Sequence, residues 1–294
     1  MEYIEPSWGV VIVAYNPDVN KFKKKIEKAS EYIPNLVIIN NGERIELDDV
    51  DVINLEDNKG IAYAQNYGVK YLSKISVDVI FFFDQDSKFD SEYFSEMLKE
   101  WLHIKQKDDK TAMLSPLIVD EKFNNISRMM AIRSNSVKLV KLSENEHQII
   151  KNTLPISSGV LVERKFYELV GGTKPILFND LVDHELDLNL IRNGFSTYST
   201  NRVRLLHNIG NKTKRKLLWK NIYPYNYPLT REYFYMRNSM FLIKNYSKDF
   251  KGLKSYIGRT LMIRLIFTFY EPHKIKRANA MIKGIFDGVK LPKD

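Results

Sequence analysis

The sequence of 294 residues contains no cysteine, and this absence excludes several kinds of chemistry. Without thiols there is no disulfide, no thiolate nucleophile and no zinc site built on cysteine. Residues 1–9, MEYIEPSWG, have acids and a proline where a secretory signal needs basic residues and an apolar core. We therefore expect the protein to stay in the cytoplasm.

Long apolar segments and the common glycine-rich nucleotide motifs are also missing. The apolar stretch Leu261–Tyr270 is interrupted by Arg264 and is shorter than the roughly 20 residues that a membrane span needs. Neither GxGxxG nor a P-loop lysine pattern follows the first apolar run. Dinucleotide-binding and P-loop proteins are therefore disfavoured.

The whole protein has a net charge of +9, and acidic residues are scarce in the last third of the chain. From Asn201 onward there are 21 Lys and Arg against 5 Asp and Glu, whereas the residues before it have 24 against 31. This asymmetry indicates an anionic partner, either a nucleic acid or a membrane surface. A solvated basic face packed on the rest of the protein is the simpler alternative.

The residues beside these basic side chains help to decide between a nucleic acid and a membrane surface. Lysines and arginines stand beside Tyr and Trp219 in KTKRKLLWKNIYPYNY, residues 212–227, which is typical of a peripheral segment at an anionic membrane. No RNA-binding or DNA-binding module is recognisable, so nucleic acid is disfavoured. The membrane surface and the solvated face both stay open, and a peripheral position at the inner face of the cell membrane is one expectation.

What is present in the first half is an alternation of apolar runs with segments of helical periodicity. This order is typical of βαβ units and predicts an α/β fold with a mixed, mostly parallel sheet flanked by helices. Residues 124–141 lack a clear period and are compatible with an antiparallel excursion. The predicted strands cover residues 8–16, 36–40, 51–55, 79–83, 112–119 and 154–160, and the predicted helices cover 19–29, 57–72, 91–104, 161–170, 177–195, 229–246 and 250–270.

Two domains follow from this pattern and from the charge. We expect one α/β domain over residues 1–210, with a nucleotide-binding type of half at about 1–120 and a second half at about 121–210. A basic, aromatic-rich helical region is expected over residues 211–294.

An apolar strand, Val79–Phe83, leads directly into Asp84 and Asp86. Ligands bind outside the carboxyl ends of the strands in such sheets. Two carboxylates about 4 Å apart repel by roughly 4 kcal/mol at an effective dielectric constant of about 20. Mg2+ or Mn2+ would remove that repulsion. Taken alone, however, the pair favours a strand-ending turn whose aspartates are solvated.

A second group of acids lies at the start of the predicted helix in LFNDLVDHELDLNLIRNGF, residues 177–195. The helix dipole stabilises a carboxylate at this end by about 0.3–1 kcal/mol. Asp183 can point from the helix start into a cleft. Taken alone, an acidic first turn explains the segment as well. The acids are Asp180, Asp183, Glu185 and Asp187.

In their order along residues 8 to about 246, nine short motifs resemble the inverting family 2 glycosyltransferases with the GT-A fold, most closely the rhamnosyltransferase branch. One departure concerns the acceptor side, because Leu186 and Asn189 stand where the family usually has Trp and Arg. The motifs are VVIVAYNP from Val10, NNG from Asn40, NKGIAYAQNYG from Asn58, FDQDS from Phe83, SSG from Ser157, GG at Gly171, LFNDLVDHE from Leu177, HNIG from His207 and YFYMRN from Tyr233.

The resemblance implies that residues 1–210 are the catalytic domain, with a nucleotide-sugar half at about 1–120 and an acceptor half at about 121–210. It also implies a role for individual residues. Asp183 matches the catalytic base, and Glu185 either orients it or binds sugar or acceptor hydroxyls. Asp84, Asp86 and His207 would hold the divalent cation, either Mg2+ or Mn2+. The acceptor side would include Ser158, Gly159, His184 and Glu185. The nucleotide-sugar pocket would comprise Ala14, Tyr15, Asn16, Asn40, Asn58, Gly60, Asn66, Asp84, Gln85, Asp86 and Arg237.

Arg237 and His207 have two interpretations each. They can stabilise the leaving diphosphate, or they can be a surface arginine and a core histidine with satisfied hydrogen bonds. The resemblance further implies transfer of a sugar, first of all rhamnose from dTDP-rhamnose, to a saccharide or lipid-linked acceptor in cell-wall or capsule polysaccharide synthesis. A UDP-hexose or UDP-galactofuranose donor, or a non-catalytic scaffold that binds sugar nucleotides or polysaccharide, are the alternatives.

Overall fold

The computed structural model describes residues 6–48, 50–120, 125–126, 128–207, 213–217 and 219–293. The chain divides into two compact units. The first, here called the sheet unit, comprises Met1–Ala131, Leu139–Phe178 and Val182–His207. The second, here called the helical unit, comprises Ile132–Lys138, Asn179–Leu181 and Asn208–Asp294.

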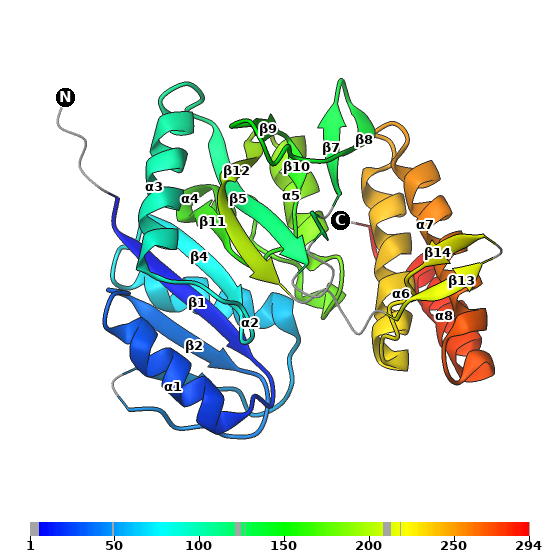
Figure 1. The fold of residues 1–294 in the computed structure, drawn as a ribbon, viewed down its shortest axis with the longest axis horizontal. Helices are drawn as coiled ribbons and strands as arrows, with labels where there is room; N and C mark the ends of the chain where they lie inside the picture. The colour runs from blue at the N-terminus through cyan, green and yellow to red at the C-terminus, as the bar shows by residue number, and fades with distance from the viewer. Residues whose placement is uncertain are drawn as a thin grey trace. The chain divides into compact units, whose positions relative to one another are not determined.

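The sheet unit is built on one large sheet with the order β3-β2-β1-β4-β11-β5-β12-β9, in which β6 also pairs with β5 (Figure 1). Strands β1 to β5 and β12 run parallel to one another, whereas β6, β9 and β11 run antiparallel. The predicted mixed, mostly parallel sheet is confirmed. The strands are β1 Trp8–Ala14, β2 Leu36–Asn40, β3 Asp51–Asn54, β4 Val79–Asp84, β5 Thr111–Asp120, β6 Asn125–Ile126, β9 Ile149–Lys151, β11 Val160–Glu163 and β12 Ser196–His207.

Helices flank this sheet and bury their apolar stripes on it, as in Rossmann-like folds. In α1 the residues Phe22, Ile26 and Ala29 are buried, and the Asp18 carboxylate accepts a hydrogen bond from the Lys21 amide at 3.3 Å. This side-chain cap satisfies one of the free amides at the helix start. The helices are α1 Val19–Ser30, α2 Ile61–Ser73, α3 Ser91–Lys105, α4 Arg164–Leu169, the 3-10 turn η1 Pro175–Leu177 and α5 Val182–Arg192.

Three local predictions differ from the structure. The strand expected over residues 154–160 is interrupted, because β10 ends at Leu154 and Gly159 has a φ of +81°, which does not fit a strand. Helix α2 begins at Ile61 with Gly60 at its N-cap. Asn58, a candidate cap for the helix expected over residues 57–72, accepts with its side chain from the Gly60 amide at 3.0 Å and does not cap α2.

The remaining short strands of the middle of the chain are antiparallel where their pairing is described. Strand β7 Met129–Arg133 pairs with β10 Thr153–Leu154, and β8 Ser136–Val140 follows it. The described part of residues 124–141 is therefore an antiparallel excursion. Strand β12 was not predicted, because its first half is rich in hydroxyl residues instead of apolar ones. The Ser199 hydroxyl bonds to those of Ser115 and Thr153, at 2.6 and 2.7 Å.

The helical unit packs three helices, α6 Leu229–Tyr246, α7 Leu253–Phe267 and α8 Lys274–Lys290, with the 3-10 turn η2 Thr268–Tyr270. It also contains the hairpin of β13 Arg215–Leu217 and β14 Lys220–Ile222. Both predicted helices are present, but α8 was not predicted. No helix in the described part of the chain is long and apolar enough to cross a bilayer.

A buried ion network joins these three helices. The Glu232 carboxylate of α6 accepts from Arg264 of α7 at 2.9 Å and from Arg277 of α8 at 3.2 Å. All three side chains are buried. Removing one partner of such a network costs about 3–5 kcal/mol because a buried charge is then left uncompensated.

Candidate functional site

Three polar side chains end the parallel strands β4, β5 and β12 at one edge of the large sheet, with the antiparallel β11 between β4 and β5. Asp84 ends β4, Asp120 ends β5 and His207 ends β12. Because these strands run in the same direction, their carboxyl ends meet at one edge, where α/β proteins bind ligands. Asp120 lies opposite His207 in the register of β5 and β12. Asp120 was not predicted, although Leu117–Val119 before it is an apolar run that ends in an acid, like the one before Asp84.

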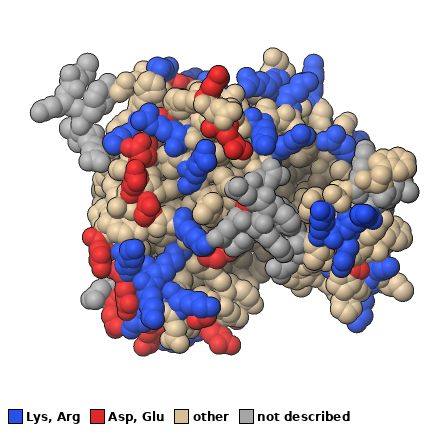
Figure 2. Space-filling view, in the orientation of Figure 1, with Lys and Arg blue, Asp and Glu red and all other residues tan. Residues whose placement is uncertain are grey.

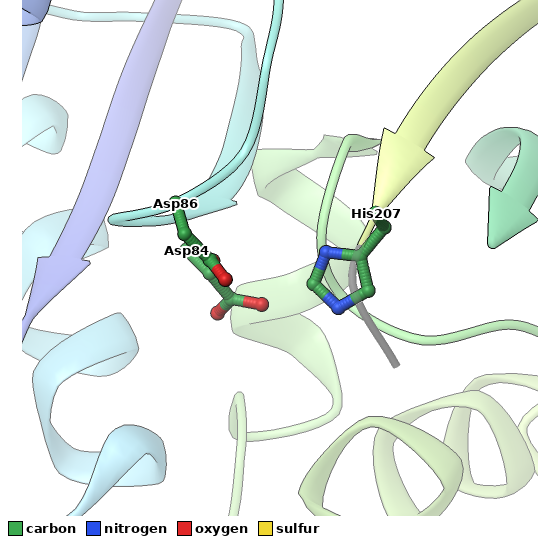
Figure 3. Close-up of side chains that lie close together, drawn as sticks. All are labelled: Asp84, Asp86 and His207. Atoms are coloured by element: carbon green, nitrogen blue, oxygen red, sulfur yellow. The ribbon is translucent and has the colours of Figure 1, made fainter. Parts of the chain in front are cut away.

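Asp84, Asp86 and His207 form a group that can hold a metal ion. Their ligand atoms all lie within 4.8 Å of one another, and Figure 3 shows the two carboxylates and the imidazole side by side. The Nδ1 atom of His207 is buried and has no hydrogen-bond partner among the described residues. Two carboxylates suit Mg2+ or Mn2+, and the imidazole favours the transition metal of the two. The predicted ligands are therefore brought together.

The loop that carries the two aspartates is fixed by the residues between and after them. The Gln85 side chain accepts a hydrogen bond from the Tyr15 amide at 2.6 Å, which ties the loop to the end of β1. The hydroxyls of Ser87 and Ser158 lie 2.6 Å apart and are buried. Ser158 thus connects this loop to the one before β11, and Gly159 of that loop donates its amide to the Phe82 carbonyl at 2.7 Å.

Lys25 of α1 contacts the same loop. This contact was not predicted from the sequence. Its Nζ donates to the Gln85 carbonyl at 3.1 Å and lies 4.8 Å from the centre of the Phe89 ring. Burial lowers the pKa of Lys25 to about 8, although the charges of Asp86 and Asp84 oppose this shift. A cation therefore lies beside the two aspartates before any metal binds.

Asparagine side chains order the predicted nucleotide pocket. Asn16, with a φ of +45°, accepts from the Glu43 amide at 2.8 Å, and its side chain occupies the space that a Cβ on Gly42 would need. Asn40 is fully buried and donates to the Glu43 carbonyl at 2.7 Å. Asn41 accepts from the Lys59 amide at 3.1 Å and so links this turn to the loop before α2.

The predicted pocket residues differ in how accessible they are. Tyr15 is 53% exposed, whereas Ala14 and Asn40 are fully buried. Asn66 of α2 is engaged by the turn after α4, because its amide donates to the Thr173 carbonyl at 2.6 Å and its oxygen accepts from the Tyr167 hydroxyl at 2.6 Å. Tyr15 is therefore the side chain best placed to contact a ligand, while Asn40 and Asn66 hold loops in place.

Asp183 lies in the first turn of α5 and is partly exposed. Its Oδ1 accepts from the His184 amide at 2.8 Å and lies 3.5 Å from the His184 Nδ1. Glu185 is fully buried, which favours a role in supporting Asp183 over contact with an acceptor. Burial raises the pKa of Asp187 well above its usual range, and the charges of Asp183 and Glu185 add to this shift. Asp183 is therefore the accessible carboxylate of these three.

The chain enters α5 through a strained loop. Phe178, Asp180 and Leu181 have φ values of 62°, 56° and 58°, a region that costs a non-glycine residue about 1–3 kcal/mol. Such strain persists only where the surroundings hold it. The Asn238 amide of α6 donates to the carbonyls of Asn179 and Asp180, at 2.5 and 2.7 Å.

Two arginines of α6 lie near these residues in the chain, and only Arg237 was predicted as a site residue. Arg231 pairs with the Asp180 carboxylate at 2.8 Å and so helps to hold the same loop. Arg237 donates its Nε to the Asn238 side chain at 3.0 Å and lies 4.6 Å from the centre of the Phe234 ring. Burial lowers the pKa of Arg237. Asn238 and Arg231 were not singled out from the sequence, although YFYMRN contains the first of them.

Comparison with known proteins gives one informative similarity. No family model matches the chain. The chain is 28% identical over 289 residues to the dTDP-rhamnosyl transferase RfbF of Shigella flexneri, and the alignment covers 95% of this chain and 94% of that protein. The similarity therefore extends over both units. It supports the predicted enzyme class, a glycosyltransferase.

Proposed function

We propose that the protein is a metal-dependent, inverting rhamnosyltransferase with the GT-A fold. Its donor would be dTDP-rhamnose, and its acceptor a saccharide or lipid-linked saccharide in cell-surface polysaccharide synthesis. The observation that carries this proposal is the meeting of Asp84, Asp86 and His207 at the carboxyl edge of the sheet, in a chain similar to a dTDP-rhamnosyl transferase over 95% of its length.

The residues at this edge fit a divalent cation. Two carboxylates that would repel each other are accompanied by an imidazole whose buried Nδ1 has no hydrogen-bond partner among the described residues. When bound there, the cation would supply Lewis acidity to the departing diphosphate and orient its oxygens. Lys25 would add a second positive charge beside the same loop. The Gln85 and Ser87 bonds keep the two aspartates in place while the donor binds and leaves.

Asp183 would act as the general base. The acceptor hydroxyl attacks the anomeric carbon as its proton passes to an Asp183 carboxylate oxygen, and the carbon–oxygen bond to the nucleoside diphosphate breaks with its electron pair on the diphosphate. A positioned base contributes about 10²–10⁴ to the rate. One displacement inverts the anomeric carbon and needs no carboxylate nucleophile, unlike the two-step retaining glycosidases.

The remaining predicted residues keep their roles in this proposal. Tyr15 and Asn16 would line the nucleotide pocket, with Asn40, Asn58, Gly60 and Asn66 shaping its loops. Ser158, Gly159 and His184 would lie on the acceptor side. Arg237 would contribute positive charge toward the diphosphate. A lipid-linked acceptor would make binding to an anionic membrane surface useful, and this association is part of the proposal.

Calorimetric titration and product analysis test the proposal together. In the presence of Mn2+ or Mg2+, we expect dTDP-rhamnose to bind more tightly than UDP-hexoses or UDP-galactofuranose, and chelation of the metal to weaken this binding. The product formed on a lipid-linked disaccharide should have the anomeric configuration opposite to that of the donor. Preferred transfer from a UDP-sugar would replace the donor, and retained configuration would exclude the single displacement.

A non-catalytic scaffold is the second candidate. It would bind a sugar nucleotide without turnover. Steady release of dTDP in the presence of acceptor, lost in Asp183→Asn, would exclude it.

A further inference from the structure

Helix α8 exposes an apolar stripe on the side away from its buried residues Arg277, Met281, Gly284 and Gly288. Ile275, Ile282, Phe286 and Val289 are 79%, 51%, 64% and 60% exposed. Their spacing of seven, four and three residues places them along one side of a helix with 3.6 residues per turn. Single exposed apolar residues are common on protein surfaces, but a row of four along about 21 Å of helix needs a partner.

A row of lysines runs beside this stripe. Lys276, Lys283 and Lys290 are exposed and follow each other at intervals of seven residues. Each of them comes directly after a residue of the apolar side, so the row lies about 100° around the helix. The one acid of α8, Asp287, accepts a hydrogen bond from the Tyr233 hydroxyl at 2.9 Å. The three exposed lysines outnumber this one carboxylate, so this side of α8 keeps a net positive charge.

The opposite face of α8 is already fixed to the protein, so the stripe is not an inward face left uncovered. A Cβ on Gly284 would lie 2.4 Å from the Tyr233 carbonyl, and one on Gly288 would lie 2.3 Å from the Arg237 carbonyl. These two glycines allow α8 to lie directly against the backbone of α6. Arg277 on the same inward side binds the buried Glu232. Helix α8 cannot turn its stripe inward without breaking these contacts.

Helix α7 and η2 of the same unit have a similar composition. No Asp or Glu occurs over residues 253–270, and Arg259 is exposed. Over these residues the exposed apolar side chains are Met262, Ile263, Leu265, Ile266 and Phe269. The basic, apolar character of α8 is thus shared by a neighbouring element of the helical unit. Figure 2 shows Lys and Arg side chains gathered on this unit with few acids among them.

We propose that the apolar stripe and lysine row of α8 form a docking surface for an anionic lipid bilayer. Such a helix lies in the plane of the interface, with its apolar side chains at the boundary of headgroups and acyl chains and its lysines at the lipid phosphates. The proposal rests on the proposed function only in that a lipid-linked acceptor would be reached there. It adds α8 to residues 212–227, for which the sequence left a membrane contact open.

The charge pattern argues for lipid over the other occupants. A second copy would pair through the same patch on both chains, which brings one lysine row against another. The single acid of α8, Asp287, would compensate only part of this repulsion. A nucleic acid would neutralise the lysines but would leave the apolar stripe in water. A bilayer with anionic headgroups would bury the apolar stripe and neutralise the lysine row at the same time.

Flotation with vesicles tests the proposal without any catalytic readout. The full-length protein is mixed with vesicles of phosphatidylcholine alone or with phosphatidylglycerol added, at low salt. We expect it to float with the anionic vesicles and to stay behind with the neutral ones. Each basic residue near such a surface contributes about 1 kcal/mol. Changing Lys276, Lys283 and Lys290 to Gln should therefore weaken the partition coefficient by about 100-fold.

Matched variants separate this face from the general surface. Lys21, Lys24 and Lys28 are exposed on α1, and changing them to Gln removes the same charge from the sheet unit. Phe286→Ser should weaken flotation, whereas Leu169→Ser, at a residue 68% exposed on α4, should leave it unchanged. Circular dichroism confirms that each variant is folded, and dTDP-rhamnose titration shows whether the donor site is intact.

Three results would overturn the proposal. They are no flotation of the wild-type protein with anionic vesicles, equal losses in the α1 and α8 lysine variants, and a wild-type dimer that Phe286→Ser converts to a monomer. The last result would assign the face to a second copy. Because these readouts need neither donor nor acceptor, they remain independent of the proposed rhamnosyl transfer.

Discussion

The two acidic clusters of the sheet unit differ in what surrounds their carboxylates. Asp84 and Asp86 lie beside the His207 imidazole and near the Lys25 ammonium, at the edge of the sheet. On α5, by contrast, the charges of Asp183 and Glu185 raise the pKa of Asp187 further, in addition to its burial. The same residue type thus has two environments, one that attracts a cation and one that favours holding a proton.

This difference shows that the two clusters can serve different roles in one reaction, metal binding in one case and proton transfer in the other. Asp84 and Asp86, beside an imidazole and an ammonium, are suited to hold a metal ion that in turn binds the diphosphate. A partly exposed carboxylate next to buried acids is suited to accept a proton from an acceptor. The strongest way to break this comparison is to exchange carboxylates for amides, one cluster at a time.

The largest effect is expected for Asp183→Asn. Loss of the base should lower kcat by about 10²–10⁴ and leave the affinity for dTDP-rhamnose nearly unchanged. Asp187→Asn is the matched control on the same helix, and kcat should stay within about threefold because this side chain is buried. Initial rates and donor titrations measure both variants. Equal losses in the two variants would remove Asp183 as the base.

Asp86→Asn should have the next largest effect. Loss of one ligand should weaken Mn2+ binding and lower kcat/KM by about 100-fold, since a bound cation stabilises transition-state charge by several kcal/mol. Higher Mn2+ concentrations should recover part of the activity. Glu56→Gln, an exposed carboxylate elsewhere on the sheet unit, is the control. Wild-type metal affinity in Asp86→Asn, measured by calorimetry, would contradict the assignment.

A smaller effect is expected from the strained loop before α5. Asn238→Ala removes the donor to the Asn179 and Asp180 carbonyls, which should cost about 1–3 kcal/mol of folding stability. If this loop sets the position of Asp183, kcat should also fall by about tenfold while donor affinity is kept. Asn245→Ala, on the same helix, is the control. A loss of stability with unchanged kcat would show that the bond serves folding alone.

The smallest effect concerns stability and pH. The folded-state pKa of Asp187 is raised, so the unfolded chain binds fewer protons than the folded protein above about pH 4, and stability falls as pH increases from there. Asp187→Asn removes this loss. The variant should therefore be more stable than the wild type at pH 7 and lose that advantage near pH 4, which urea unfolding at several pH values would measure. A constant difference across this range would exclude titration of Asp187.

The sequence predicted the parallel strands and the Asp84–Asp86 pair because both depend on local order. A buried strand is a continuous apolar run, and residues directly after it must lie at the ligand-binding edge. Strand β12 was missed because Ser196–Thr200 is polar, and its hydroxyls find partners only through distant residues. The place of His207 at the sheet edge therefore follows from tertiary pairing.

Lys25 and α8 show two other limits. Lys25 is one of three consecutive lysines, and only its contact with the Gln85 carbonyl distinguishes it from the others. In α8 the exposed apolar residues alternate with lysines and two glycines, so no single stripe stands out from the pattern. Its inward face is defined by the backbone of α6, which no local pattern contains.

Glu232 has a consequence for how the helical unit opens. Because one buried carboxylate binds arginines from both α7 and α8, neither helix can separate without leaving charge behind in the interior. The three helices should therefore exchange their most protected amide hydrogens through one common opening. A lipid surface that holds α8 would then slow exchange in α6 and α7 as well, although neither of them needs to touch the bilayer.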